Sequence, residues 1–322
     1  MAEQRKIIID TDPGIDDAMA IFYALESAEL DVIGLTTVFG NAHVETCTTN
    51  ALTLLEIAGR ADIPVVPGAG APLVRPYRGP VPFVHGEDGQ GDVFLAPPTT
   101  KPLEVHAATW IIDTVMAAPG QITLVPIGPL TNITLALTLQ PGLAEHIREI
   151  VLMGGSAFRG GNTSPAAEAN IFNDPDAADI VFGAECPIVM AGLDVTEVTV
   201  MTPADLDRIT TFDNPRARHL AAILPHYIEF NRRSSGEEGI PIHDSSAISY
   251  LVAPDAYRWV EHPVRVDCGD SFGRGATIPA VRAGHRENAW TDRRPTRILT
   301  EVDERRVIEL ELERMQRPSL AG

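Results

Sequence analysis

The chain has 322 residues, with 25 Lys and Arg against 44 Asp and Glu, and therefore a formal net charge of −19. Hydrophobic residues make up 44% of the chain and charged residues 21%, a globular composition that excludes wholesale disorder. The negative charge argues against nucleic acid or an anionic membrane surface as a partner, because neither attracts an acidic protein.

Short β-rich runs alternate with helical runs along the chain. In order, the pattern predicts a strand at Lys6–Asp10, helix Asp16–Glu26, strand Val32–Val38, helix Val44–Gly59, strand Pro64–Pro67, helix Val105–Ala117, strand Ile122–Ile127, helix Asn132–Leu139, strand Glu149–Met153, helix Pro175–Ala184 and strand Ile188–Leu193. A helix from Pro215 to about Arg233, another from near Asp244, short strands within Pro263–Val302 and a helix at Asp303–Arg314 complete it. This alternation predicts an α/β fold with a Rossmann-like, mostly parallel sheet flanked by helices. No repeat or clean linker interrupts it, so we expect a single domain over residues 1–322.

Cysteine content and the N-terminal segment bear on the compartment. Cys47, Cys186 and Cys268 are widely spaced and odd in number, which favours a reducing compartment over a disulfide framework. The apolar run Ile7–Ile9 is too short for a signal peptide, and no uncharged apolar stretch reaches the roughly 18 residues of a membrane span. We therefore expect a cytoplasmic protein without a membrane partner.

Two long loops stand where ligands bind in such a fold. The loop Gly68–Pro102 is rich in Gly and Pro, and the loop Gly154–Asn170 is rich in Gly, Ser and Asn. Loops of this length in a compact domain are usually functional or mobile. In open α/β sheets, ligands bind outside the carboxyl ends of the strands, so the chemistry is expected in the loops that follow the strands.

The first of these strand ends is strongly acidic. The segment Asp10–Asp17 reads Asp-Thr-Asp-Pro-Gly-Ile-Asp-Asp, and no Lys or Arg occurs between Lys6 and Arg60. Capping of the following helix explains one or two of these residues, because Asp is a favoured N-cap. Four clustered carboxylates without local cations repel one another, and a hard divalent ion with oxygen ligands relieves that repulsion. The segment therefore predicts a metal or catalytic site.

Several motifs together resemble one known family. The segment Ile9–Ala18 resembles the N-terminal motif of the inosine-uridine-preferring nucleoside hydrolases. Further matches follow in the order of the chain, at Val38–Asn41, Leu124–Asn132, Val151–Gly155 with Glu168–Asn170, and His243–Asp244. The likeness extends over about residues 6–312. Ordered matches that each follow a predicted strand or open a helix are far more specific than one motif alone.

The resemblance implies both the reaction and its metal. The reaction is hydrolysis of the N-glycosidic bond of ribonucleosides to ribose and free base, as in purine or pyrimidine salvage, with a metal-bound water as nucleophile. The implied cofactor is Ca²⁺, held by Asp12, by Asp17 through both oxygens, by Asp244 and by the main-chain carbonyl of Ile127. Three carboxylates and a carbonyl suit Ca²⁺, which takes 6–8 oxygen ligands. From the residues alone, Ile127 is an ordinary buried strand end.

The resemblance also assigns roles around the ribose. Asp12 would accept the proton of the attacking water while it remains a metal ligand, and Asp16 would hold the ribose 2′-hydroxyl. Five further residues are expected to contact the sugar, with those around the 5′-hydroxyl given first: Met153, Asn162, Glu168, Asn170 and Asn41. Neutral amides and a single carboxylate fit a sugar that has hydroxyls and no phosphate. A lone loop Asn is more often turn chemistry, and Met153 alone is more often core.

Two histidines are expected beside the leaving base. His243 precedes the metal ligand Asp244, and an unperturbed His pKa lies in the range of a general acid. His85, in the long Gly-rich loop, resembles a second histidine on the base side. The helix before His243 departs from the family pattern, because Asn231 and Ser235 stand where some members have Tyr and Arg that grip a purine. The preferred base is therefore open.

Two rival functions remain at this point. Asp10-Thr11-Asp12 also fits the nucleophile motif of haloacid-dehalogenase phosphatases, but these need a downstream Lys, and none follows Lys101. The second rival is a non-catalytic protein that binds calcium or a nucleoside, which would have no need of a leaving-group acid. Whichever function holds, we expect a homo-oligomer, either a dimer or a tetramer.

Overall fold

The structure, a computed structural model, describes residues 4–236, 238–282 and 289–317. Its central strands are β1 (Arg5–Thr11), β2 (Leu30–Thr37), β3 (Val65–Pro67), β4 (Ile122–Pro126), β5 (Glu149–Met153), β6 (Ile188–Ala191), β9 (Tyr257–His262) and β12 (Thr296–Val302). They form one eight-stranded sheet in the order β3-β2-β1-β4-β5-β6-β12-β9. Every neighbouring pair is parallel except β12 with β9, so the predicted α/β fold with a mostly parallel sheet is confirmed.

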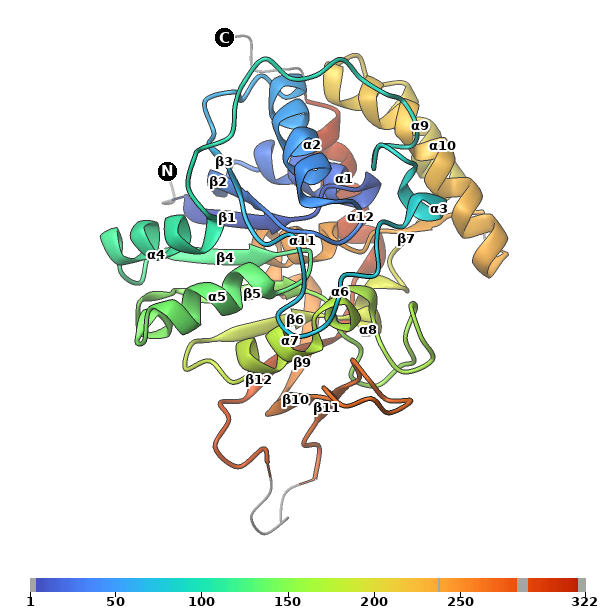
Figure 1. Cartoon of the computed structure of the whole chain (residues 1–322). Helices are drawn as coiled ribbons and strands as arrows, with labels where there is room; N and C mark the ends of the chain where they lie inside the picture. Colours follow the sequence, from blue (N-terminus) through green and yellow to red (C-terminus); the bar gives the residue numbers. More distant parts are fainter. Residues whose placement is uncertain (1–3, 237, 283–288, 318–322) are drawn as a thin grey trace.

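Helices cover both faces of this sheet (Figure 1). They are α1 (Ile15–Leu25), α2 (Val44–Ile57), α3 (Pro82–His85), α4 (Ala107–Ala117), α5 (Thr131–Leu139), α6 (Ala169–Asn173), α7 (Pro175–Val181), α8 (Leu193–Thr196), α9 (Pro203–Thr210), α10 (Pro215–Ser235), α11 (Ser245–Val252) and α12 (Glu304–Met315), with short 3₁₀ turns at Leu143–His146 and Pro254–Ala256. Two small antiparallel pairs lie outside the sheet, β7 (Val200–Met201) with β8 (Ile240–Pro241) and β10 (Val264–Val266) with β11 (Thr277–Pro279).

The core is divided between the two faces. Side chains alternate across a strand, so neighbouring residues of β1 belong to different clusters. Ile7 and Ile9 pack with residues of α1, α2, α10, α11 and α12, whereas Ile8 packs with residues of α4, α5 and α7. All three isoleucines are completely buried. A continuous apolar run is therefore what a strand covered on both faces requires.

Most predicted elements are present, and the differences are local. The predicted strand Ile188–Leu193 ends at Ala191, because Gly192 caps the short helix α8 there. The long Gly-Pro loop contains one helical turn, α3, which begins with Pro82 and ends with His85. Among the described residues, no helix is long and apolar enough to cross a membrane. The acidic segment follows β1, next to β4 in the middle of the sheet, where loops from several strands converge.

Candidate active site

The acidic segment makes a tight turn from β1 into α1. Gly14 is the N-cap of α1, and its N–H donates to Asp17 Oδ2 at 2.9 Å. A Cβ at Gly14 would lie 2.6 Å from His85 Nδ1, so only glycine fits this close approach. At the start of the segment, the buried Asp10 accepts hydrogen bonds from Thr36 Oγ1 and Asn132 Nδ2 on the same carboxylate oxygen. Asp10 therefore braces the turn from the side of the sheet.

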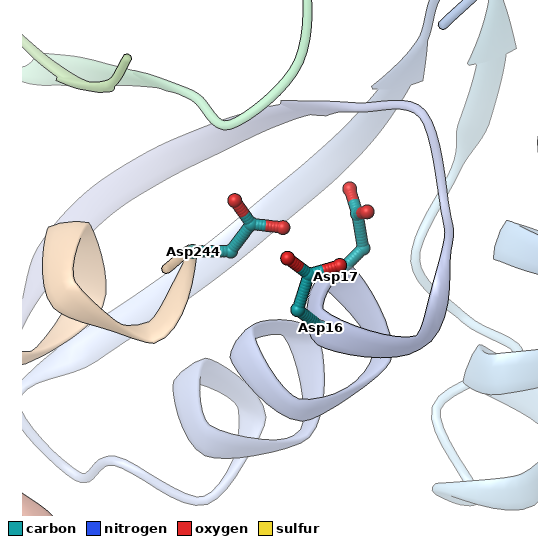
Figure 2. Close-up of side chains that lie close together, drawn as sticks. All are labelled: Asp16, Asp17 and Asp244. Atoms are coloured by element: carbon teal, nitrogen blue, oxygen red, sulfur yellow. The ribbon is translucent and has the colours of Figure 1, made fainter. Parts of the chain in front are cut away.

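Three carboxylates converge at the N-terminal ends of two helices. Asp16 and Asp17 open α1, and Asp244 precedes α11, 227 positions after Asp17 in the sequence. One oxygen of each carboxylate lies within 4.8 Å of the others, and the side chains point toward one another (Figure 2). The pKa of Asp16 and of Asp17 is raised to about 6, mainly by burial, and for Asp17 the charge of Asp16 contributes to this rise. Burial and the charges of Asp16, Asp17 and Asp12 raise the pKa of Asp244.

Asp12 lies beside this cluster rather than within it. Its Oδ2 accepts the backbone N–H of Asn41 at 2.7 Å, while its buried Oδ1 has no hydrogen-bond partner among the described residues. Burial raises its pKa, followed by the charge of Asp17. A Cβ at Gly40 or at Gly128 would overlap the Asp12 carboxylate, which explains why glycine stands at both motif positions. The sequence placed Asp12 among the ligands and Asp16 on the ribose, whereas the structure groups Asp16 with Asp17 and Asp244.

The donor set fits a hard divalent cation. Asp12 Oδ1 and Asp16 Oδ1 are buried polar atoms with no partner in the described part of the chain, and leaving such atoms bare is costly. Among the described residues, no Lys or Arg forms an ion pair with Asp16, Asp17 or Asp244, and the candidate ligand atoms are all carboxylate oxygens. Oxygen ligands of this kind are those that Ca²⁺ and Mg²⁺ take. A cation would lower the raised pKa values and remove the mutual repulsion.

The carbonyl of Ile127, an expected ligand, lies at the end of β4 and faces Asn170. Asn170 Nδ2 donates to this carbonyl oxygen at 3.0 Å and approaches the carbonyl oxygen of Met153 at 3.3 Å and its sulfur at 3.5 Å. The structure therefore brings Ile127, Met153 and Asn170 together across β4, β5 and the start of α6. Asn41 belongs to the same region, since its Nδ2 donates to Asp17 Oδ2 at 3.0 Å.

Glu168 and Asn162 occupy the loop before α6 in different settings. Glu168 is buried and is the N-cap of α6, where its carboxylate accepts backbone N–H groups from Asn170, Ile171 and Gly155. Burial raises its pKa, although these hydrogen bonds oppose the shift. Asn162 is exposed, and its side-chain oxygen accepts from the N–H of Ala169 at 3.1 Å. No hydrogen bond within the described residues links Asn162 to the carboxylate cluster.

His85 lies directly over the turn. Its Nδ1 accepts the N–H of Ile15 at 3.2 Å and is 3.9 Å from Asp16 Oδ1. Tyr227, from α10, stacks on this imidazole with ring centroids 5.9 Å apart and an interplanar angle of 18°. The Tyr227 hydroxyl also opposes the rise in the pKa of Asp16. Sequence reasoning missed Tyr227, because an aromatic residue inside an amphipathic helix carries no local sign of a site.

His243 is buried, and its ring is held by a neighbour. Thr196 Oγ1, at the end of α8, lies 2.9 Å from His243 Nδ1, which leaves Nε2 available for another partner. Burial lowers the pKa of His243 to about 4, and His85 contributes to the shift. With this pKa, which is below the ordinary His value, the buried imidazole is neutral near pH 7. Thr196 was also missed, since a lone Thr at the end of a short helix has no distinctive spacing.

Comparisons with known proteins point to one family. The family described as inosine-uridine preferring nucleoside hydrolase matches residues 7–309. A probable uridine nucleosidase 2 from Arabidopsis thaliana is 40% identical over 318 residues, covering 98% of each chain. A pyrimidine-specific ribonucleoside hydrolase, RihB, from Escherichia coli is 41% identical over 277 residues, covering 84% of this chain and 87% of its own. The structure of the plant nucleoside hydrolase PpNRh1 superposes with a TM-score of 0.95 at 38% identity, covering 98% of this chain and all of that one.

Proposed function

This chain belongs to the inosine-uridine preferring nucleoside hydrolase family, and we propose that it hydrolyses pyrimidine ribonucleosides, uridine above all, to ribose and the free base. As a nucleoside hydrolase it is a glycosidase that acts on N-glycosyl compounds. The preference for a pyrimidine is supported by the names of two relatives, a probable uridine nucleosidase and a pyrimidine-specific ribonucleoside hydrolase, at 40% and 41% identity. The sequence alone left the base open.

The single observation that carries the proposed chemistry is the pair of partnerless carboxylate oxygens, Asp12 Oδ1 and Asp16 Oδ1, beside Asp17 and Asp244. We infer a calcium site here, with Asp17 and Asp244 as ligands, Asp16 or Asp12 as a third carboxylate, and the Ile127 carbonyl completing the protein's share. A bound Ca²⁺ would make a water more acidic and give the ribose hydroxyls a fixed point of attachment. The number of oxygen donors favours Ca²⁺ over Mg²⁺, which usually keeps several waters.

Different residues of the chain are proposed for different roles around the ribose. Asp12, held through one oxygen by Asn41, has its other oxygen free to take a proton from the attacking water. Carboxylates packed beneath the ribose stabilise the positive charge of an oxocarbenium-like transition state. Asp16, Asn170 and Asn41 are the proposed contacts for the ring hydroxyls. Met153, Glu168 and the exposed Asn162 are the proposed neighbours of the 5′-hydroxyl.

The departing base needs hydrogen-bond donation rather than metal chemistry. Thr196 occupies Nδ1 of His243, so Nε2 is the atom that faces other partners. Because the pKa is near 4, we propose that His243 donates from a neutral imidazole or from a small imidazolium fraction. His85, with Nδ1 committed to Ile15, offers Nε2 in the same way. Tyr227 fixes the plane of His85 by stacking.

A nucleoside panel with ribose release as the readout tests this proposal. We expect release from uridine and cytidine at higher kcat/KM than from inosine, adenosine and guanosine. Without the 2′-hydroxyl, 2′-deoxyuridine should be slower by about 100-fold, because the buried polar groups that bind the hydroxyl lose their partner. Phosphate release from a nucleotide without ribose release would favour the phosphatase, and binding without turnover would favour the non-catalytic protein. Equal rates on all bases would overturn the pyrimidine preference.

A further inference from the structure

A hydrogen-bond network behind the acidic turn has no role in the proposed chemistry. Its centre is Gln90, a 95%-buried glutamine five residues after His85 in the loop 86–92. Its carboxamide nitrogen donates to the carbonyl oxygen of Gly14 at 2.8 Å and lies 3.3 Å from that of Pro13. It also donates to the carbonyl of Gly89 at 3.0 Å. Because carbonyl oxygens only accept, these neighbours fix which end of the carboxamide faces the turn.

The other end of the same side chain is also held. Gln90 Oε1 lies 2.9 Å from Nε2 of His219, which comes from α10 and is itself buried. Burial lowers the pKa of His219 to about 4, so this histidine is neutral near pH 7 and donates from Nε2. The ring of His219 is in turn fixed edge-on against Phe22 of α1, with centroids 6.2 Å apart. Gln90 is therefore anchored to α1 by way of α10.

A second buried amide reinforces the contact from α2. Asn50 Nδ2 donates to the carbonyl of Pro13 at 3.1 Å and to that of Asp88 at 2.9 Å, which ties the turn to the loop directly. Gly89 has a φ of +73°, and a Cβ there would lie 2.8 Å from Asn50 Nδ2. The loop is itself ordered by the Asp88 carboxylate, which accepts the N–H groups of Gln90, Asp92 and Phe94.

We propose that Gln90 is a positioning residue. By binding the carbonyls of Pro13 and Gly14, it fixes the carboxylates on either side of them, and it couples the metal-binding turn to the loop that carries His85. The inference rests on the proposed metal site and extends it. Asp12 precedes the held peptide units and Asp16 and Asp17 follow them, so a shift of these carbonyls displaces the carboxylates. Since His85 accepts from Ile15 on the same turn, metal binding and base binding act on one hydrogen-bonded unit.

Three variants and one matched control test the network. Gln90→Leu removes both ends of the amide at similar volume, Gln90→Glu keeps only the acceptor for His219, and His219→Phe removes only the anchor while keeping an aromatic ring. The control, Asn214→Ala, also deletes a buried amide, but this amide bonds to Met315 of α12 and to Ala217 in the first turn of α10 rather than to the acidic turn. All four proteins are compared after their folding has been verified by circular dichroism.

Two measurements follow, and neither depends on turnover. Titration calorimetry of the metal-free proteins should give a Ca²⁺ affinity lowered about tenfold by Gln90→Leu and Gln90→Glu and about threefold by His219→Phe, as expected for lost positioning hydrogen bonds. Asn214→Ala should keep the wild-type affinity. Hydrogen exchange should be faster in residues 12–15 and 86–92 of the Gln90 variants, and Ca²⁺ should slow exchange of 86–92 in the wild type but not in Gln90→Leu.

The outcomes separate this inference from the proposed function. If the wild-type protein binds no Ca²⁺, the proposed metal site is wrong, and the exchange rates of 12–15 without metal decide the role of Gln90 on their own. If the wild type binds Ca²⁺ and Gln90→Leu binds it equally well with unchanged exchange, Gln90 is not a positioning residue. Should Gln90→Leu fail to fold, Gln90→Glu and His219→Phe give the same decision.

Discussion

Two buried acidic turns border the same end of the sheet, one after β1 and one before α6. They differ in whether the carboxylate oxygens have hydrogen-bond partners. In the turn before α6, both oxygens of Glu168 are satisfied by backbone N–H groups of Gly155, Asn170 and Ile171. In the turn after β1, Asp12 and Asp16 each retain a buried oxygen without a partner in the described chain. Burial raises the pKa in both turns. The raised pKa therefore does not distinguish them, whereas the missing partners do.

The difference teaches which acidic turn is able to take a cation. A carboxylate that caps a helix already has its hydrogen bonds, and its charge interacts favourably with the N-terminus. A carboxylate with a bare buried oxygen beside other carboxylates needs a cation or a proton. Substitutions in the two turns should accordingly damage different properties, and each of the following predictions either sharpens that contrast or breaks it.

The largest effect is expected for the turn after β1. Exhaustive chelation should abolish ribose release and added Ca²⁺ should restore it. Asp17→Asn should lower kcat/KM by about 10³-fold or more, since a metal contributes several kcal/mol to catalysis and each 1.36 kcal/mol is tenfold. Asp113→Asn, at an exposed position of α4, is the control and should keep full activity. Full activity in protein shown by elemental analysis to be metal-free would contradict the proposed calcium site.

The next effect concerns His243. His243→Ala should slow hydrolysis of natural nucleosides by about 10²–10⁴-fold, the usual contribution of one positioned proton donor. The same variant should keep most of its rate on 4-nitrophenyl riboside, because nitrophenolate leaves without a proton. Steady-state kinetics on both substrates make the comparison. A parallel loss on the two would remove His243 from the donor role and leave His85 as the next candidate.

A smaller effect on activity is expected for the turn before α6. Glu168→Gln replaces one accepting oxygen by an N–H₂ group, which leaves a buried backbone N–H without an acceptor at a cost of about 1–3 kcal/mol in stability. Thermal unfolding should register that cost, while kcat/KM falls by about tenfold at most, through KM, and the Ca²⁺ affinity stays unchanged. Loss of Ca²⁺ binding in Glu168→Gln would break the contrast between the two turns.

The smallest effect is a pH dependence of stability. In metal-free protein the pKa of Asp16 and of Asp17 is about 6, above the value of 3.8 for ordinary Asp, so the folded state holds more protons. The contribution of these two raised pKa values to the free energy of unfolding is complete below about pH 4 and is lost as the pH rises through about 6. Ca²⁺ requires ionised carboxylates, so its stabilising effect grows over the same interval. We expect the rise in melting temperature on adding Ca²⁺ to be about 5 °C larger near pH 7.5 than near pH 5, by differential scanning calorimetry. An equal rise at both values would contradict ionisation of this pair on metal binding.

The sequence by itself determined the fold class and predicted where the chemistry lies. Periodic apolar runs predict the strands and helices, because side chains share one face every two residues in a strand and every three or four residues in a helix. The clustered carboxylates of Asp10–Asp17 indicated a cation because no Lys or Arg lies nearby in the chain. The likeness to the nucleoside hydrolases, confirmed by the match over residues 7–309, supplied the reaction.

Only the tertiary structure decided which groups meet. Asp16 joins Asp17 and Asp244 because α1 and α11 direct their N-terminal ends at one point. Tyr227 stacks on His85 across 142 positions of sequence, and Gln90 reaches the carbonyl of Gly14 across 76. Glu168, which the sequence placed near the 5′-hydroxyl, is also the N-cap of α6. Such contacts depend on how helices pack against a shared sheet, and the spacing of residues along one chain does not encode that packing locally.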